Sequence, residues 1–306
     1  MGSLRLTGIM TALVTPYDAE GRVNLPVVRE LVEFLLSQGV QGFYVCGGTG
    51  EGLLLTEEER RLMAETVVQQ VRGRVPVVVH VGAITTDEAC RLAAHAQEAG
   101  ADAISSIPPL AYFGVGFEGI QRYYAAIAAA CDLPLYVYNI PGATGVNVSP
   151  ALFRELCLAI PTLAGMKFTS YNFFEMQQII QMEIPGRRLN VVSGPDEMMI
   201  AAQAMGADGA IGTFYNLVPR LFVDAYDAFH AGDVRRAMEL QARANRLITV
   251  YFQVGGGMSA FKAAMKLIGF DCGAGRPPLP PISPEQEERL RAELVAAGFW
   301  DVAVAR

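Results

Sequence analysis

The run Val77-Val78-Val79-His80-Val81 is apolar at every position except His80. Successive side chains of a strand point to opposite faces, so a run without alternation predicts a strand that is buried on both faces, as in a parallel sheet. Seven similar runs recur about every 20 to 35 residues, over residues 8–13, 42–46, 103–106, 135–138, 165–168, 190–193 and 209–212.

Segments of helical period separate these runs, and two of them have recognisable starts. Thr56-Glu57-Glu58-Glu59 fits a capping box, and Ser149-Pro150 fits an N-cap followed by proline at the first helical position. Strand and helix alternate about eight times over some 225 residues. This alternation favours a closed (β/α)₈ TIM barrel over an open doubly wound sheet, which is the alternative fold.

The strand pattern stops near residue 226. Helices are predicted over 233–251, 258–268 and 284–297, separated by glycine- and proline-rich loops. We therefore expect a barrel domain over residues 1–225 and a C-terminal helical domain over residues 226–306. Packing or oligomerisation is the expected role of the helical domain.

The composition is that of a globular protein, with 306 residues, 52% hydrophobic and 18% charged. A net charge of −7 offers no long-range attraction for nucleic acid or an anionic membrane, so a small-molecule partner is expected. The five scattered cysteines form no CxxC pair, which fits a reducing cytoplasm. Neither a signal peptide nor a membrane span is expected.

Lysine is scarce, since only Lys167, Lys262 and Lys266 occur among 24 basic residues. Lys262 and Lys266 stand four residues apart in a predicted helix and are expected on a solvated or interface face. Lys167 lies within the apolar run 163–169, where burial favours the neutral amine. A neutral amine can attack a ketone, so Lys167 is a candidate Schiff-base nucleophile; a buried lysine paired with an acidic residue is the alternative.

Tyr138 ends a predicted strand and is followed by Asn139-Ile140-Pro141-Gly142. In a barrel, this position places the hydroxyl at the C-terminal mouth, where a phenol could relay protons to and from a carbinolamine. Simple packing of an aromatic ring at a strand end is the alternative.

The segment Gly47-Gly48-Thr49-Gly50-Glu51-Gly52 joins a predicted strand to a helix. Its backbone N–H groups could converge on a small carboxylate, with the Thr49 hydroxyl as a further donor. It lacks the Gly-Lys-Ser/Thr of a P-loop and the GxGxxG of a dinucleotide site. A plain tight turn is the alternative.

Asp196 and Glu197, within Ser193-Gly194-Pro195-Asp196-Glu197, also follow a predicted strand. They either stabilise a helix start or form hydrogen bonds with substrate hydroxyls. The histidines are isolated and no HExxH motif occurs, so neither a metal nor a cofactor is expected.

Five segments together resemble the dihydrodipicolinate synthase and N-acetylneuraminate lyase family. They are GGTGEG from Gly47, YNIP from Tyr138, GMKFTS around Lys167, SGPDE from Ser193 and GADGAIGTFYN from Gly206. The resemblance covers nearly the whole chain, in order. It implies a (β/α)₈ barrel with a C-terminal helical domain, class I aldolase chemistry with pyruvate and usually a homotetramer.

The resemblance also implies roles for individual residues. Lys167 matches the Schiff-base lysine, and Tyr138 matches the catalytic tyrosine. Thr49 matches the hydroxyl residue that binds the pyruvyl carboxylate and links to a second tyrosine from a neighbouring subunit, for which Tyr112 is the candidate. Gly48 stands where the family usually has serine or threonine, so one carboxylate donor is missing. Further positions match contacts to a polyhydroxylated substrate tail: Thr169, Gly194, Asp196, Glu197 and Thr213.

The two branches of the family differ after the YNIP motif. Dihydrodipicolinate synthases typically carry an arginine two residues after its proline, where this chain has Ala143. Without a bidentate partner for the carboxylate of aspartate semialdehyde, that activity is disfavoured. The sequence therefore predicts an N-acetylneuraminate lyase-like enzyme for a 2-keto sugar acid. The alternatives are a dihydrodipicolinate synthase and a non-catalytic ligand-binding homologue, the latter supported by Gly48 alone.

Overall fold

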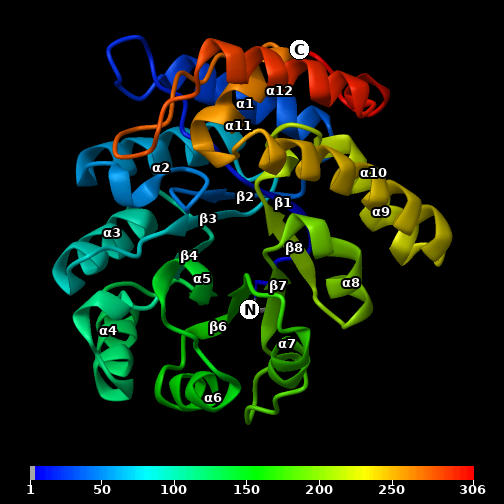
Figure 1. Cartoon of the computed structure of the whole chain (residues 1–306). Coiled ribbons are helices and arrows are strands. Elements are labelled where there is room, and N and C mark those ends of the chain that lie inside the picture. Colours follow the sequence, from blue (N-terminus) through cyan, green and yellow to red (C-terminus); the bar gives the residue numbers. More distant parts are fainter. Residues whose placement is uncertain (1–3) are drawn as a thin grey trace.

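A closed barrel of parallel strands forms the centre of the computed structural model, which describes residues 4–306 (Figure 1). Strand β1 pairs with β8, and Gly8 lies opposite Gly209, so the sheet closes on itself. This closure confirms the predicted (β/α)₈ barrel and excludes the open sheet. The strands are β1 (Gly8–Ala12), β2 (Gly42–Val45), β3 (Val77–His80), β4 (Ala103–Ser106), β5 (Leu135–Asn139), β6 (Leu163–Phe168), β7 (Asn190–Ser193) and β8 (Gly209–Gly212).

Helices follow the strands and surround the barrel (Figure 1). The capping box at Thr56 is confirmed, and Ser149 caps its helix by accepting a hydrogen bond from the Leu152 backbone N–H. The helices up to the last strand are α1 (Leu25–Ser37), α2 (Glu57–Val71), α3 (Thr86–Glu98), α4 (Phe117–Ala129), α5 (Pro141–Thr144), α6 (Pro150–Ala159), α7 (Phe173–Ile180) and α8 (Met199–Ala204).

Two layers of side chains bury the strands. One layer packs between the strands and the surrounding helices, and the other fills the barrel interior with residues such as Tyr44, Val78 and Tyr136. Two tyrosine hydroxyls of the interior are paired, since Tyr44 donates to Ser105 Oγ at 3.0 Å and Tyr136 donates to Asn190 Oδ1 at 2.9 Å. The interior is therefore a packed core that leaves its open space at the carboxyl ends of the strands.

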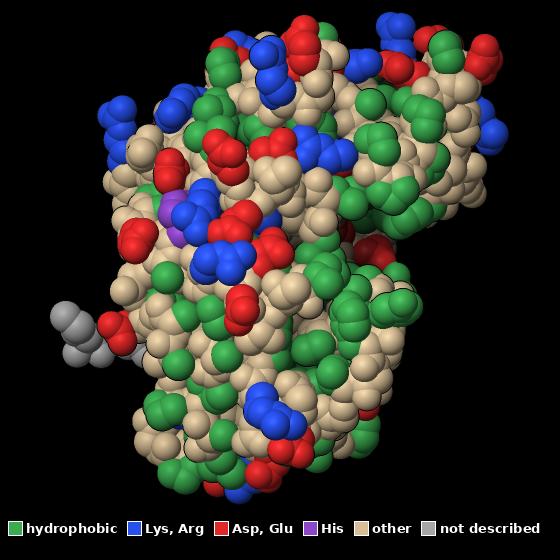
Figure 2. Space-filling model, turned by 90° about the vertical axis from the view of Figure 1, so that its left-hand side faces the viewer, with side chains coloured by type: hydrophobic (Ala, Val, Ile, Leu, Met, Phe, Trp, Pro, Cys, Tyr) green, Lys and Arg blue, Asp and Glu red, His purple; other side chains and the backbone are tan. Residues whose placement is uncertain are grey.

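The charged surface over α2 and α3 carries both signs close together (Figure 2). Glu57 accepts from Arg61 within α2 and from Arg91 of α3, at 2.5 Å and 2.7 Å. His95 of α3 contacts Glu65 of α2 at 2.8 Å. Pairs that remain partly exposed to water contribute little stability each, so the two helices are held mainly by their buried faces.

The C-terminal helices are α9 (Pro219–His230), α10 (Val234–Gln253), α11 (Gly257–Leu267) and α12 (Pro284–Ala296). Helices α11 and α12 lie beside α1 at the top of Figure 1. Phe34 of α1 packs against Phe270, with ring centroids 5.2 Å apart. Helix α9 is continuous across residues 225 and 226, and the division into two domains there remains a prediction.

The expectation for one of the two C-terminal lysines was wrong. Lys262 is fully buried and forms an ion pair with Glu51, 2.6 Å away, because its face of α11 packs against the loop after β2. Lys266, one turn later, is exposed and lies 3.2 Å from Glu287. Within residues 4–306, no helix is long and apolar enough to cross a membrane.

Candidate active site

A cavity of about 490 Å³ opens at the carboxyl ends of the barrel strands. Its walls come from the ends of β5 and β6 and from the loops after β2, β7 and β8. Every residue that the sequence suggested for substrate binding lines it, together with both principal catalytic candidates: Gly48, Thr49, Tyr138, Lys167, Thr169, Gly194, Asp196, Glu197 and Thr213. The fold thus brings these residues together, while their individual roles remain predictions.

Lys167 lies inside the barrel mouth, directly across the sheet from Tyr138. Its side-chain amine is 4.1 Å from the Tyr138 ring centroid and 4.2 Å from the Tyr44 ring centroid, and the residue is 4% exposed. Burial lowers the pKa of Lys167 to about 7, against the opposing effect of the Asp196 charge. A large fraction of the amine is therefore uncharged near neutral pH.

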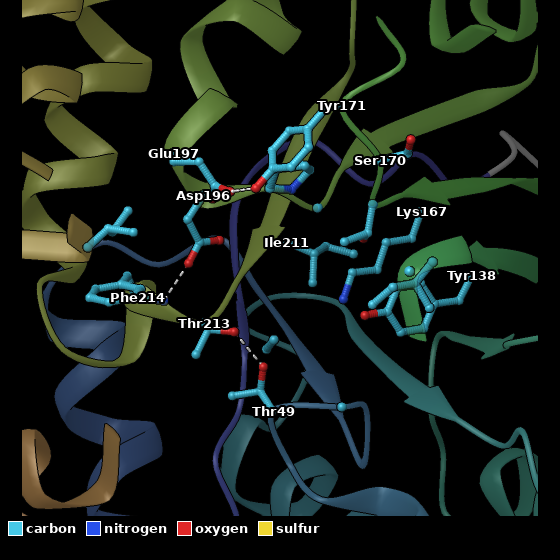
Figure 3. Close-up of a pocket in the computed structure, with 18 of the residues that line it drawn as sticks. Thr49, Tyr138, Lys167, Ser170, Tyr171, Asp196, Glu197, Ile211, Thr213 and Phe214 are labelled. Carbon is cyan, nitrogen blue, oxygen red and sulfur yellow. Dashed lines mark hydrogen bonds between the residues drawn. The ribbon is translucent and has the colours of Figure 1, made fainter. Parts of the chain in front are cut away.

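Tyr138 has the opposite protonation preference. Burial raises the pKa of Tyr138 to about 12, so the phenol carries its proton near neutral pH. Figure 3 shows its hydroxyl close to the Lys167 amine. Its ring packs edge-on against Tyr44 and His80, with centroids 5.8 Å and 6.0 Å away. A neutral amine and a proton-carrying phenol therefore share one end of the cavity.

Gly48 leaves open space beside that phenol. A Cβ added at Gly48 would meet only the Tyr138 hydroxyl, at 4.0 Å. A serine or threonine side chain has room at this position, and in this chain its hydroxyl is missing.

Thr49 is held by a loop from the same side of the barrel, since β1 alone separates β2 from β8. Its hydroxyl lies 2.6 Å from the Thr213 hydroxyl, which joins the loop after β2 to the loop after β8 (Figure 3). Tyr112 lies outside the cavity, in the 3₁₀ helix Ala111–Phe113, and is 90% exposed. Its donation to a neighbouring subunit remains a prediction.

The acidic end of the cavity lies after β7. Asp196 is 6% exposed, and its Oδ2 accepts from the Phe214 backbone N–H at 2.7 Å. Its Oδ1 has no hydrogen-bond partner among the described residues. Burial raises the pKa of Asp196 to about 7. One oxygen of this carboxyl group is therefore buried without a hydrogen-bond partner.

Glu197 has a partner that the sequence analysis missed. Tyr171, in the loop after β6, donates its hydroxyl to Glu197, and this bond raises the pKa of Tyr171 to about 12. Tyr171 lines the cavity at its rim. An aromatic residue shortly after the lysine strand was the only available signal.

Gly212 provides the space for the Asp196 carboxylate. A Cβ at this position would lie 1.9 Å from Asp196 Oδ1 and 2.6 Å from the Tyr215 ring. We expect Gly212→Ala to displace Asp196 and to lower the free energy of unfolding by about 1 to 3 kcal/mol, as overpacked cores do. Urea unfolding checks this, with Gly142→Ala as the control because a Cβ there meets nothing within 4 Å. Equal stability of the two variants would contradict the prediction.

The fold and the cavity are those of the (β/α)₈ barrel class, whose enzymes carry their active site at the carboxyl ends of the strands. Residues 5–297 match the dihydrodipicolinate synthetase family. The chain therefore belongs to this family and is a lyase of the aldolase type.

Relatives from both branches are equally similar to this chain. It is 35% identical over 303 residues to N-acetylneuraminate lyase of Rhizobium meliloti (strain 1021), covering 99% of each chain. It is also 35% identical over 296 residues to 4-hydroxy-tetrahydrodipicolinate synthase of Nitratidesulfovibrio vulgaris (strain DP4), covering 97% of this chain and 100% of that protein. Among solved structures, Proteus mirabilis N-acetylneuraminate lyase has a TM-score of 0.90 and 32% identity, covering 97% of this chain and 100% of the other. Similarity alone thus leaves the substrate open.

Proposed function

We propose that this protein is a class I aldolase that holds pyruvate, or the pyruvyl end of a longer 2-keto acid, as a Schiff base on Lys167. The observation that carries this proposal is the buried Lys167 amine, whose pKa is lowered to about 7, beside the protonated Tyr138 phenol in the cavity. A nucleophilic amine and a proton donor are the two groups that imine formation requires.

The reaction begins when the neutral Lys167 amine attacks the C2 ketone and Tyr138 gives its proton to the resulting alkoxide. Loss of water from the carbinolamine forms an iminium, which withdraws electrons from the C3–C4 bond. That bond breaks as the C4 hydroxyl loses its proton, which releases an aldehyde and leaves an enamine. Protonation at C3 and hydrolysis then release pyruvate, and synthesis is the reverse. Backbone N–H groups near Gly48 and the Thr49 hydroxyl hold the carboxylate and orient C2.

The substrate that we propose is N-acetylneuraminate or a similar 2-keto sugar acid. Asp196 and Glu197 both line the cavity, and their carboxyl groups are the acceptors that we propose for substrate hydroxyls. Ala143 lies on α5, in an adjoining cavity that also contains Gly48 and Tyr138, and offers only a methyl group. The alternative, 4-hydroxy-tetrahydrodipicolinate synthase activity, is supported by relatives of equal identity.

We further propose a cytoplasmic homotetramer in which Tyr112 reaches the site of a neighbouring subunit. The five cysteines are free thiols, which fits a reducing compartment. Tyr112 is exposed together with Phe113 and Phe117, and exposed apolar groups of this kind fit a contact with another copy.

Borohydride reduction in the presence of pyruvate, followed by peptide mass mapping, tests the mechanism. The expected adduct is on Lys167, and unmodified Lys262 and Lys266 serve as internal controls. An unmodified Lys167 would contradict the mechanism.

A panel of 2-keto sugar acids, assayed for released pyruvate, tests the substrate. Turnover of aspartate semialdehyde with no cleavage of any sugar acid would favour the alternative.

The rate of trapping should depend on pH. Only the neutral amine attacks, so the rate at low pyruvate concentration should rise about tenfold per pH unit below the Lys167 pKa of about 7 and level off above it. Because the Asp196 charge raises the pKa of Lys167, Asp196→Asn should move the midpoint to lower pH. Stopped-time borohydride trapping across a pH series measures both midpoints. A wild-type midpoint above roughly 9 would indicate an ordinary lysine and contradict the prediction.

A further inference from the structure

The loop after β2 contains a residue in an unusual backbone conformation. Glu51 has φ 56° and ψ 31°, in the left-handed region that non-glycine residues seldom adopt. It is 4% exposed, so its carboxylate is directed into the protein. Such conformations persist where the surrounding structure enforces them, which directs attention to the partners of this side chain.

Both partners of the Glu51 carboxylate come from the C-terminal segment. The Lys262 amine lies 2.6 Å from Oε1, and the Arg276 backbone N–H donates to Oε2 at 2.6 Å. Lys262 also donates to the Ala274 carbonyl at 3.2 Å and lies 3.8 Å from the Tyr17 ring centroid. The two charges are thus excluded from water and compensate each other.

The Arg276 side chain extends this connection along the same loop. Its guanidinium donates to the Leu54 carbonyl at 3.1 Å and to both oxygens of Glu59, at 2.6 Å and 2.7 Å. Glu59 in turn closes the capping box at the start of α2. The C-terminal segment therefore holds the loop at its turn, at its end and at the helix that follows.

The held loop is the one that carries Gly48 and Thr49 into the cavity. Thr49 lies two residues before Glu51, and the Gly50 carbonyl between them accepts from the Thr15 hydroxyl at 2.7 Å. A Cβ at Gly52 would lie 1.8 Å from the Cys46 carbonyl oxygen, so the loop ends are tightly packed. The orientation of the N–H groups at positions 48 and 49 thus depends on where Glu51 is anchored.

We propose that Glu51 and Lys262 are positioning residues, which act through Gly48 and Thr49 to hold the binding site for the carboxylate of the 2-keto acid. This inference rests on the proposed function, because it assigns that carboxylate to the loop. It gives α11 a part in substrate binding in addition to packing. Loss of the ion pair should weaken binding of the keto acid more than it slows the chemical step.

The double variant Glu51→Gln/Lys262→Met tests this inference, because it removes both charges and leaves neither buried alone. In borohydride trapping we expect the half-saturating pyruvate concentration to rise at least about tenfold, while the maximal trapping rate stays within about twofold. Lys266→Met, on the exposed side of the same helix, is the matched control and should behave as the wild type.

A folded double variant with the wild-type half-saturating concentration overturns the inference. If the double variant does not fold, Glu51→Gln decides, because glutamine keeps the size of the side chain and an oxygen for the Arg276 bond. An unchanged half-saturating concentration in Glu51→Gln would then overturn it as well. Failure of the proposed function is distinct, since it would appear as absence of a Lys167 adduct in the wild type.

Discussion

Replacing Lys167 with methionine is expected to eliminate pyruvate trapping and to lower carbon–carbon cleavage by more than about a thousandfold, since no other group supplies the covalent intermediate. Methionine keeps the apolar length of the side chain between Tyr44 and Tyr138. The fold should therefore survive, and removal of a poorly solvated amine should leave the free energy of unfolding equal or slightly higher. Steady-state cleavage assays and urea unfolding measure the two effects.

Lys167→Arg is the informative companion variant. Arginine is also a basic residue, but its guanidinium remains protonated at all accessible pH values. It therefore cannot act as the nucleophile. It should be as inactive as the methionine variant and less stable, because it places a permanent charge at a site with 4% exposure. Lys266→Arg, at an exposed position, controls for the exchange itself. Retention of cleavage in either Lys167 variant would refute covalent catalysis at this residue.

The barrel could be predicted from local patterns because each strand is buried on both faces. Val77–His80 has four buried residues in succession, and such strands lack the alternation of a half-exposed sheet. The same logic identified Lys167, since a lysine within an apolar run must occupy a poorly solvated site. Both inferences need only the local environment of each residue, which a short stretch of sequence already describes.

Contacts between distant residues could not be predicted in this way. The Thr49 hydroxyl meets Thr213, which lies 164 positions later. Lys262 was expected on a solvated or interface face, because helical period identifies an apolar stripe but not which charged residue the tertiary fold will cover. Its partner Glu51 is set by the packing of α11 on the β2 loop, a property of the folded chain.

The acidic end of the cavity shows the same limit. The sequence placed Asp196 and Glu197 after a strand, yet both a helix start and a substrate site remained open. The structure shows that the two residues have different environments. Asp196 is buried with an unpaired oxygen, while Glu197 accepts a hydrogen bond from Tyr171 at the rim of the cavity. Two adjacent carboxylates thus differ in solvation, and only their three-dimensional surroundings reveal the difference.

Tyr138→Phe should lower the maximal rates of trapping and cleavage by about 10²- to 10⁴-fold, the range for loss of a positioned acid–base group. The ring remains packed against Tyr44 and His80, so the free energy of unfolding should change little. The half-saturating pyruvate concentration should also change little, because the carboxylate is held by the loop after β2. Gly48→Ser in the wild-type background is a useful comparison, since its Cβ would lie 4.0 Å from the Tyr138 hydroxyl and the phenol is retained. Single-turnover trapping rates separate the steps, and a Tyr138→Phe enzyme with an undiminished rate would assign the proton transfer to another group.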